Sequence, residues 1–168
     1  MFDVFWTISF RKYKLFLLIP VLGFIIYMGF KYQNPNLQYF VLLVLGIILC
    51  IPTSEREKLH FIKASFFIGK NYLLQQIKTT CHNSIFVLIP IVIVFAIFQD
   101  FDKIAFIPLV LLLPIVNLLF KYVFFDRIIV HNIFFALFMG GLIYGFPLLF
   151  IPILYFKAIK NLKIIQNA

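Results

Sequence analysis

A large share of the charged side chains lies in one stretch, residues 52–83, which reads PTSEREKLHFIKASFFIGKNYLLQQIKTTCHN. Acidic and basic side chains alternate at its start, and only basic ones follow: Glu55, Arg56, Glu57, Lys58, Lys63, Lys70 and Lys78. Charged side chains of this kind form ion pairs and charge-assisted hydrogen bonds. We interpret the stretch as a partly helical cytoplasmic segment that contacts another protein.

The same stretch contains a triplet, Gly69-Lys70-Asn71, that resembles the last three residues of a phosphate-binding loop. Such a loop needs the pattern G-x-x-x-x-G-K-[ST]. Here Ala64 replaces the first glycine, and Asn71 replaces the hydroxyl residue that binds magnesium. We therefore reject the triplet as a nucleotide site.

Catalytic and metal-binding patterns are not evident elsewhere in the sequence. His60 and His82 lack metal-ligand spacing, and we interpret Cys50 and Cys81 as inert small hydrophobes in a reducing compartment. For His131 we favour a structural hydrogen bond near the cytoplasmic interface over a proton-transfer role. We expect no enzyme activity, no metal and no cofactor.

The composition indicates that lipid is part of the solvent of this chain. Of its 168 residues, 64% are hydrophobic and only 12% are charged, whereas about a quarter of a soluble domain is charged. The net charge of +9 is not arranged as the basic stripe of a nucleic-acid-binding fold. The basic residues instead lie at the ends of apolar blocks, as in cytoplasmic loops of membrane proteins, so we expect no nucleic-acid partner.

Residues 1–14 have the periodicity of an amphipathic helix. Polar side chains fall on one face, and aromatic side chains, including Tyr13, fall on the other. This pattern predicts an interfacial helix whose aromatic anchors enter the lipid boundary. The anchors are Phe2, Phe5, Trp6 and Phe10. A cytoplasmic extension of the first span is the alternative.

Four apolar blocks approach the length of about 20 residues that a helix needs to cross about 30 Å of hydrocarbon. We predict membrane spans at residues 15–30, 37–51, 84–98 and 104–120. Pro20 is a candidate kink in the first span, and we expect Pro52 to end the second.

Within residues 52–83 we expect a helix capped by Ser54, with Glu55 and Glu57 in its first turn near the positive end of the helix dipole. Gly69 is the natural stop of this helical region. A second helix should begin near Lys70 and lead into the third span.

Residues 128–156 are too long for one comfortable span and too short for two full ones. Glycine and proline cluster near residues 140–147, which favours a hairpin. With a hairpin both termini are cytoplasmic and 13 of the 15 basic residues lie inside, whereas a single bent span leaves ten inside. The positive-inside rule therefore favours the hairpin.

Together these features predict an all-α polytopic membrane protein with a single domain, residues 1–168. It has about six transmembrane helices, the last two short, or a span and a re-entrant segment that the C-terminal helix completes. An interfacial helix precedes the first span, and a cytoplasmic helical segment joins spans two and three.

Residues 52–77 resemble the permease subunits of type 2 ABC transporters of the exporter class. In that family a "PTSE-x-E" phrase opens the loop between spans two and three, and the matching residues here are Pro52, Thr53, Ser54, Glu55 and Glu57. The small-residue turn, basic residue and re-entry helix that follow are matched by Ala64, Ser65, Gly69, Lys70, Tyr72 and Leu73. The chain departs from the family where Phe66 and Phe67 replace leucine and proline.

The resemblance implies a multi-pass subunit of the bacterial cytoplasmic (inner) membrane that pairs with a second permease copy or paralogue. A separate cytoplasmic ATP-binding subunit would power it by docking on a coupling helix. The implied docking residues are Glu55, Arg56, Glu57, Lys58, His60, Phe61 and Lys63. The alternative is a small membrane protein without a transport path, such as an immunity, regulatory or assembly factor, with its central loop beside anionic lipid.

Overall fold

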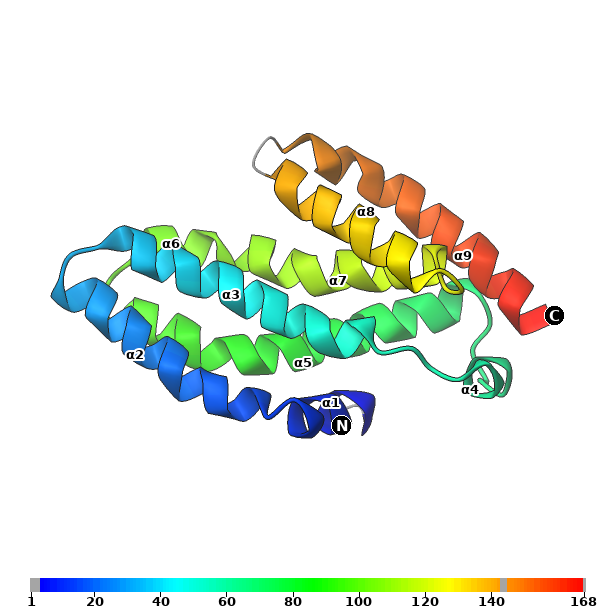
Figure 1. The fold of residues 1–168 in the computed structure, drawn as a ribbon, viewed down its shortest axis with the longest axis horizontal. Coiled ribbons are helices and arrows are strands. Elements are labelled where there is room, and N and C mark those ends of the chain that lie inside the picture. The colour runs from blue at the N-terminus through cyan, green and yellow to red at the C-terminus, as the bar shows by residue number, and fades with distance from the viewer. Residues whose placement is uncertain (1–3, 143–144, 168) are drawn as a thin grey trace. The chain divides into compact units, whose positions relative to one another are not determined.

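A computed structural model describes residues 4–142 and 145–167, and within these ranges the chain is helical and contains no β-strand. The elements, in chain order, are α1 (Val4–Lys12), η1 (Leu15–Leu17), α2 (Leu18–Lys31), α3 (Pro35–Ser54), α4 (Leu59–Lys63), α5 (Lys70–Ile97), α6 (Phe101–Ala105), α7 (Ile107–Val123), α8 (Ile128–Gly141), η3 (Phe146–Phe150) and α9 (Ile151–Asn167) (Figure 1). The all-α class predicted from the sequence is confirmed.

Three of the described helical stretches are long and apolar enough to cross a membrane: Pro35–Ser54, Lys70–Ile97 and Phe101–Val123. Helices α2 and α8 are apolar but shorter, with 14 residues each. At about 1.5 Å per residue, each shorter helix covers about 21 Å, less than the hydrocarbon core. These lengths and compositions are consistent with a membrane protein.

The chain forms two compact units. Unit 1 contains residues 1–55 and 79–114, and unit 2 contains residues 56–78 and 115–168. Because the unit boundaries fall inside α5 and α7, each of these helices contributes one part to each unit. Unit 2 holds ten of the 15 basic residues but only two of the six acidic ones.

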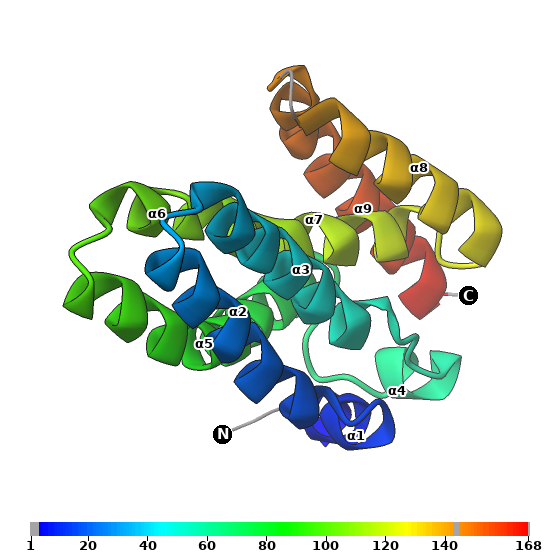
Figure 2. The same cartoon turned by 60° about the vertical axis from the view of Figure 1, so that its left-hand side comes forward.

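The core of unit 1 joins buried side chains of α1, α2, α3, α5 and α7, including Trp6, Ile26, Leu45, Phe95 and Val110. Helices α2 and α3 lie side by side in both views (Figures 1 and 2). Their connection is short because Asn34 caps α3, accepting a hydrogen bond from Asn36 N (3.1 Å), and Pro35 occupies the first helical position. Both residue types are favoured there.

The core of unit 2 joins α4, α5, α7 and α9 around Ile62, Leu73, Leu118, Tyr122 and Leu162. Helices α8 and α9 run antiparallel and side by side in both views (Figure 2). Gly145, which directly precedes η3, has a φ of 72°, a left-handed value that glycine adopts without steric penalty. Helices α8 and α9 thus run in opposite directions, while the membrane topology expected for residues 128–156 stays a prediction.

The structure corrects the expected effects of two prolines. Helix α2 begins at Leu18, so Pro20 lies in its first turn, where the missing N–H has no helical partner to lose. Helix α3 continues past Pro52 to Ser54. The hydroxyls of Thr53 and Ser54 both donate to the Cys50 carbonyl, at 2.9 Å each, which supplies extra hydrogen bonds in this last turn.

The predicted coupling helix is shorter and starts later than expected. Ser54 ends α3 and does not cap α4, which begins only at Leu59. Glu55 and Lys58 have extended backbones, with ψ angles of 133° and 140°. The chain is not helical just before Gly69, which has a φ of 50°, and α5 starts at Lys70. The expected stop at Gly69 itself is wrong, because α4 already ends at Lys63.

Two of the predicted aromatic anchors, Trp6 and Phe10, have inward positions. Trp6 and Phe10 are 6% and 4% exposed and stack on each other in the core of unit 1. These two side chains are therefore enclosed by protein rather than free to anchor in lipid. Phe2 and the side chain of Phe5 lie outside the described residues.

The contact between α3 and α7 in unit 1 depends on Gly46, since a Cβ atom there would lie 2.6 Å from Leu113 Cδ1. We expect Gly46→Val to reduce the free energy of unfolding by about 1–3 kcal/mol through overpacking. Leu113→Ala in the same chain should restore part of the loss. The control is Gly23→Val in α2, where a Cβ meets no atom within 4 Å. Unfolding in detergent, followed by circular dichroism, measures all variants, and equal effects at positions 46 and 23 would contradict the expectation.

Candidate functional site

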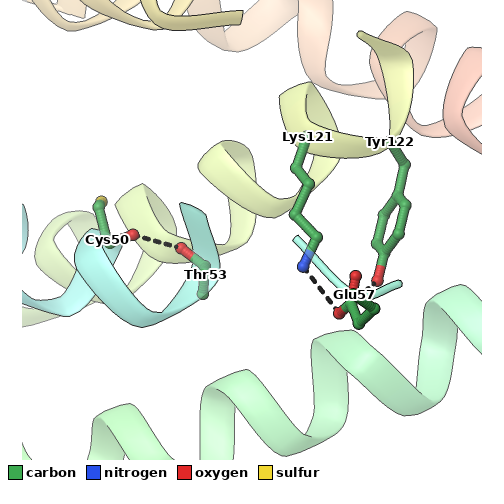
Figure 3. Close-up of polar contacts among 5 residues, drawn as sticks. All are labelled: Cys50, Thr53, Glu57, Lys121 and Tyr122. Carbon is green, nitrogen blue, oxygen red and sulfur yellow. Dashed lines mark hydrogen bonds and ion pairs between the residues drawn. The ribbon is translucent and has the colours of Figure 1, made fainter. Parts of the chain in front are cut away.

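A buried ion pair anchors the connection between α3 and α4 in unit 2. Glu57 Oε1 accepts hydrogen bonds from Lys121 Nζ (2.8 Å) and Tyr122 OH (3.2 Å), as Figure 3 shows. The Lys121 and Glu57 side chains are only 3% and 8% exposed. The connection is therefore fixed to the last turn of α7, to which Lys121 and Tyr122 belong.

The ion pair of Glu57 and Lys121 is enclosed by protein, but one of its polar atoms lacks a hydrogen-bond partner among the described residues. Tyr122 is fully buried, and the ring of Tyr72 in α5 packs edge-on against it, with 6.1 Å between the centroids. Glu57 Oε2 is buried without a hydrogen-bond partner among the described residues. An unpartnered buried polar atom costs about 1–3 kcal/mol, so this network is only partly satisfied.

Arg56 caps the C-terminal end of α7. Its Nη2 donates to the Phe124 carbonyl (3.0 Å), and its guanidinium lies 5.6 Å from the centroid of the Phe125 ring. The last carbonyls of a helix carry partial negative charge and lack helical partners. Burial lowers the pKa of Arg56 below its ordinary value, while the carboxylates of Asp126 and Glu57 oppose that shift.

Two polar side chains of α9 complete this arrangement. Asn161 Nδ2 donates to the carbonyls of Val123 (2.8 Å) and Tyr122 (3.4 Å) at the end of α7. Gln166 holds the loop after α4: its Nε2 donates to the Ile62 and Phe67 carbonyls, at 3.3 and 3.0 Å, and its Oε1 accepts from Gly69 N at 2.7 Å. Side chains of α9 thus hold both the end of α7 and the α4 segment through hydrogen bonds to main-chain atoms.

Helix α4 has one buried and one exposed side. Ile62 is fully buried, and α4 packs against α9. The exposed side and the following loop present five large apolar side chains, which we name the α4 patch: Leu59, Phe61, Phe66, Phe67 and Ile68. Phe66 is 92% exposed. Apolar side chains gathered on an exposed segment indicate a surface that binds a partner or a membrane.

The residues predicted to dock on a partner fall into two groups. Lys58, His60, Phe61 and Lys63 are exposed on or beside α4. The three residues before them are held by other parts of the chain: Glu55, Arg56 and Glu57. Glu55 belongs to unit 1, where Lys12 Nζ and Tyr13 OH donate to its Oε1 at 2.9 Å each.

A second buried polar pair lies in unit 2, where His131 Nε2 and Asn117 Oδ1 are joined by a hydrogen bond of 2.9 Å. His131 is thus hydrogen-bonded, as the structural interpretation of this residue expects. Among the described residues, no three His, Cys, Asp or Glu side chains gather as a metal site.

Sequence reasoning missed the residues that hold this site together. Lys121 follows directly after the span predicted at residues 104–120, but it lies inside α7 and is buried. Asn161 and Gln166 received no role. Their only signal is that they are uncharged polar residues in a tail whose other polar residues are mainly lysines. Their partners are main-chain atoms, which leave no mark in a sequence.

No protein-family model, curated protein or solved structure matches this chain. These comparisons therefore identify neither a family nor a fold relative.

The Glu57–Lys121 pair makes a sharp prediction about stability. Lys121→Met should reduce the free energy of unfolding by about 3–5 kcal/mol, because it leaves the Glu57 carboxylate buried and uncompensated. The double variant Glu57→Met/Lys121→Met should recover most of that loss. Denaturant unfolding in detergent provides the measurement.

The matched control for this cycle is Lys160→Met, which changes an exposed lysine of the same unit. If Lys121→Met were no more destabilising than this control, the buried pair would not hold the connection in place.

Proposed function

We propose that this chain is the membrane-spanning permease subunit of an ATP-driven exporter, powered by a separate cytoplasmic ATPase subunit. The observation that carries the proposal is the α4 patch. It lies on a short helix between two helices of membrane-spanning length, α3 and α5, and basic residues flank it. The resemblance of residues 52–77 to permeases of this class supports the same assignment.

The docking surface in this proposal is the exposed side of α4. Phe61, which is 53% exposed, supplies an aromatic contact at its centre, and Lys58 and Lys63 supply positive charge at its edge. Aromatic side chains often dominate the energy of an interface. Arg56 and Glu57 act behind this surface, because their hydrogen bonds within unit 2 hold the segment that leads into α4. Glu55 is instead held within unit 1.

Movement of the ATPase would reach the membrane through α5. Gln166 fixes the loop after α4, and α5 begins directly at the end of that loop. With 28 residues, α5 is about 42 Å long, which exceeds the hydrocarbon core and leaves turns for a cytoplasmic extension. In this proposal, nucleotide-driven closure would displace α4 and, with it, the first turns of α5, which belong to the same unit.

The topology in this proposal has six spans and cytoplasmic termini in the bacterial cytoplasmic membrane. The predominance of basic residues in unit 2 supports a cytoplasmic location for the α4 segment and for the end of α9. Two copies, or a copy and a paralogue, would flank the transport path.

Docking predicts a specific loss of partner binding. Phe61→Asp should weaken association with the ATPase about thirtyfold, the factor that corresponds to an interface hot spot of about 2 kcal/mol. Affinity purification of the tagged chain from its native membranes, with mass spectrometry and ATP hydrolysis as readouts, measures the association. Phe101→Asp is the control, since Phe101 is also exposed but lies at α6 in unit 1.

Absence of a nucleotide-hydrolysing subunit from the purified wild-type complex would overturn the exporter proposal. Equal losses in the two variants would remove α4 as the docking site.

The topology has its own prediction. Cysteine introduced at Lys63 should react with a membrane-impermeant maleimide only from the cytoplasmic side, and cysteine introduced at Gln33 only from the outer side. Intact cells and inside-out vesicles give the two measurements in a chain whose Cys50 and Cys81 are replaced by alanine. Labelling of position 63 in intact cells would contradict the proposed orientation.

A further inference from the structure

Unit 2 contains a cavity of about 350 Å³ at the C-terminal end of α7. Its wall is formed by residues 123–127, which lead from α7 toward α8, and by the last turns of α9. None of the docking residues predicted from the sequence lines it.

The cavity has a cationic and an apolar part. Arg127 and Lys157 supply two exposed positive charges, against one acidic residue, Asp126. The carboxylate of Asp126 also interacts electrostatically with Arg56, which offsets part of its charge. Phe124 and Ile164 contribute apolar surface to the same wall.

Contacts within the unit keep these groups in place. The Lys157 ammonium lies 5.6 Å from the centroid of the Phe124 ring, within the range of a cation–π interaction. Asn161, also in the wall, is tied to the Val123 carbonyl at 2.8 Å. The cations are thus presented beside an apolar surface that other contacts hold in position.

The excess of basic residues in unit 2 favours an anionic ligand. Ten basic residues and two acidic ones make unit 2 strongly cationic. Such clusters face the cytoplasmic leaflet, whose anionic lipids attract basic segments. A ligand with a phosphate group and apolar chains matches the cavity in both of its parts.

We propose that this cavity binds the phosphate group of an anionic membrane phospholipid, with Arg127 and Lys157 contacting the phosphate and Phe124 and Ile164 contacting the lipid chains. The site requires a membrane but no ATPase, so it stands or falls separately from the exporter proposal.

The test titrates the purified full-length chain in detergent with phosphatidylglycerol, phosphatidylcholine or glycerol 1-phosphate and detects bound species by native mass spectrometry. The wild-type chain should bind phosphatidylglycerol at least tenfold more tightly than the other two. The variant Arg127→Gln/Lys157→Gln should lose about thirtyfold in affinity for phosphatidylglycerol, as expected for two basic residues near an anionic lipid. Unchanged thermal unfolding verifies that this variant is folded.

The matched control, Lys78→Gln/Lys160→Gln, removes the same charge from exposed residues of unit 2 that do not line the cavity. It should retain wild-type affinity. Equal losses in both double variants would reduce the effect to general electrostatic attraction and overturn the site. Glycerol 1-phosphate binding as tightly as the lipid would show a site for free phosphates, and equal binding of phosphatidylcholine would exclude charge recognition; either result overturns the proposal without any variant.

Discussion

The hydrogen-bonded ion pair of Glu57 with Lys121 and Tyr122 is the interaction on which the arrangement of unit 2 depends. It brings the connection after α3 against the end of α7, in surroundings from which water is nearly excluded. A carboxylate in such a place is stable only with its partner. The backbone is extended at Glu55 and at Lys58, on either side of the residues that bind α7. Helix α4 begins at the next residue, Leu59.

Helix ends pose the second constraint, because main-chain carbonyls at the last turn of α7 have no helical partners. Arg56 and Asn161 supply donors from two distant parts of the chain. Gln166 does the same for the loop after α4. Polar side chains that look unremarkable in the sequence thus determine where α4 lies in unit 2, and their loss would release the segment that the proposed function assigns to a partner.

The two units use their surfaces differently. Unit 1 carries nearly balanced numbers of charges, while unit 2 is mainly basic. In unit 2, α4 presents apolar side chains, whereas the cavity beside α9 combines cations with an apolar wall. A protein partner and a phospholipid would therefore bind separate surfaces, since Phe61 and Lys63 do not line that cavity.

The sequence by itself determined the helical class, the apolar blocks, the break before Lys70 and the continuous helix that follows, because periodicity and backbone sterics act over a few residues. Only the tertiary structure decided that Glu57 and Trp6 face inward, that α3 passes Pro52, and that Asn161 and Gln166 hold neighbouring segments. Each of these outcomes depends on partners far along the chain, and a contact of that kind, above all one to a main-chain carbonyl, has no local signature in the order of the residues.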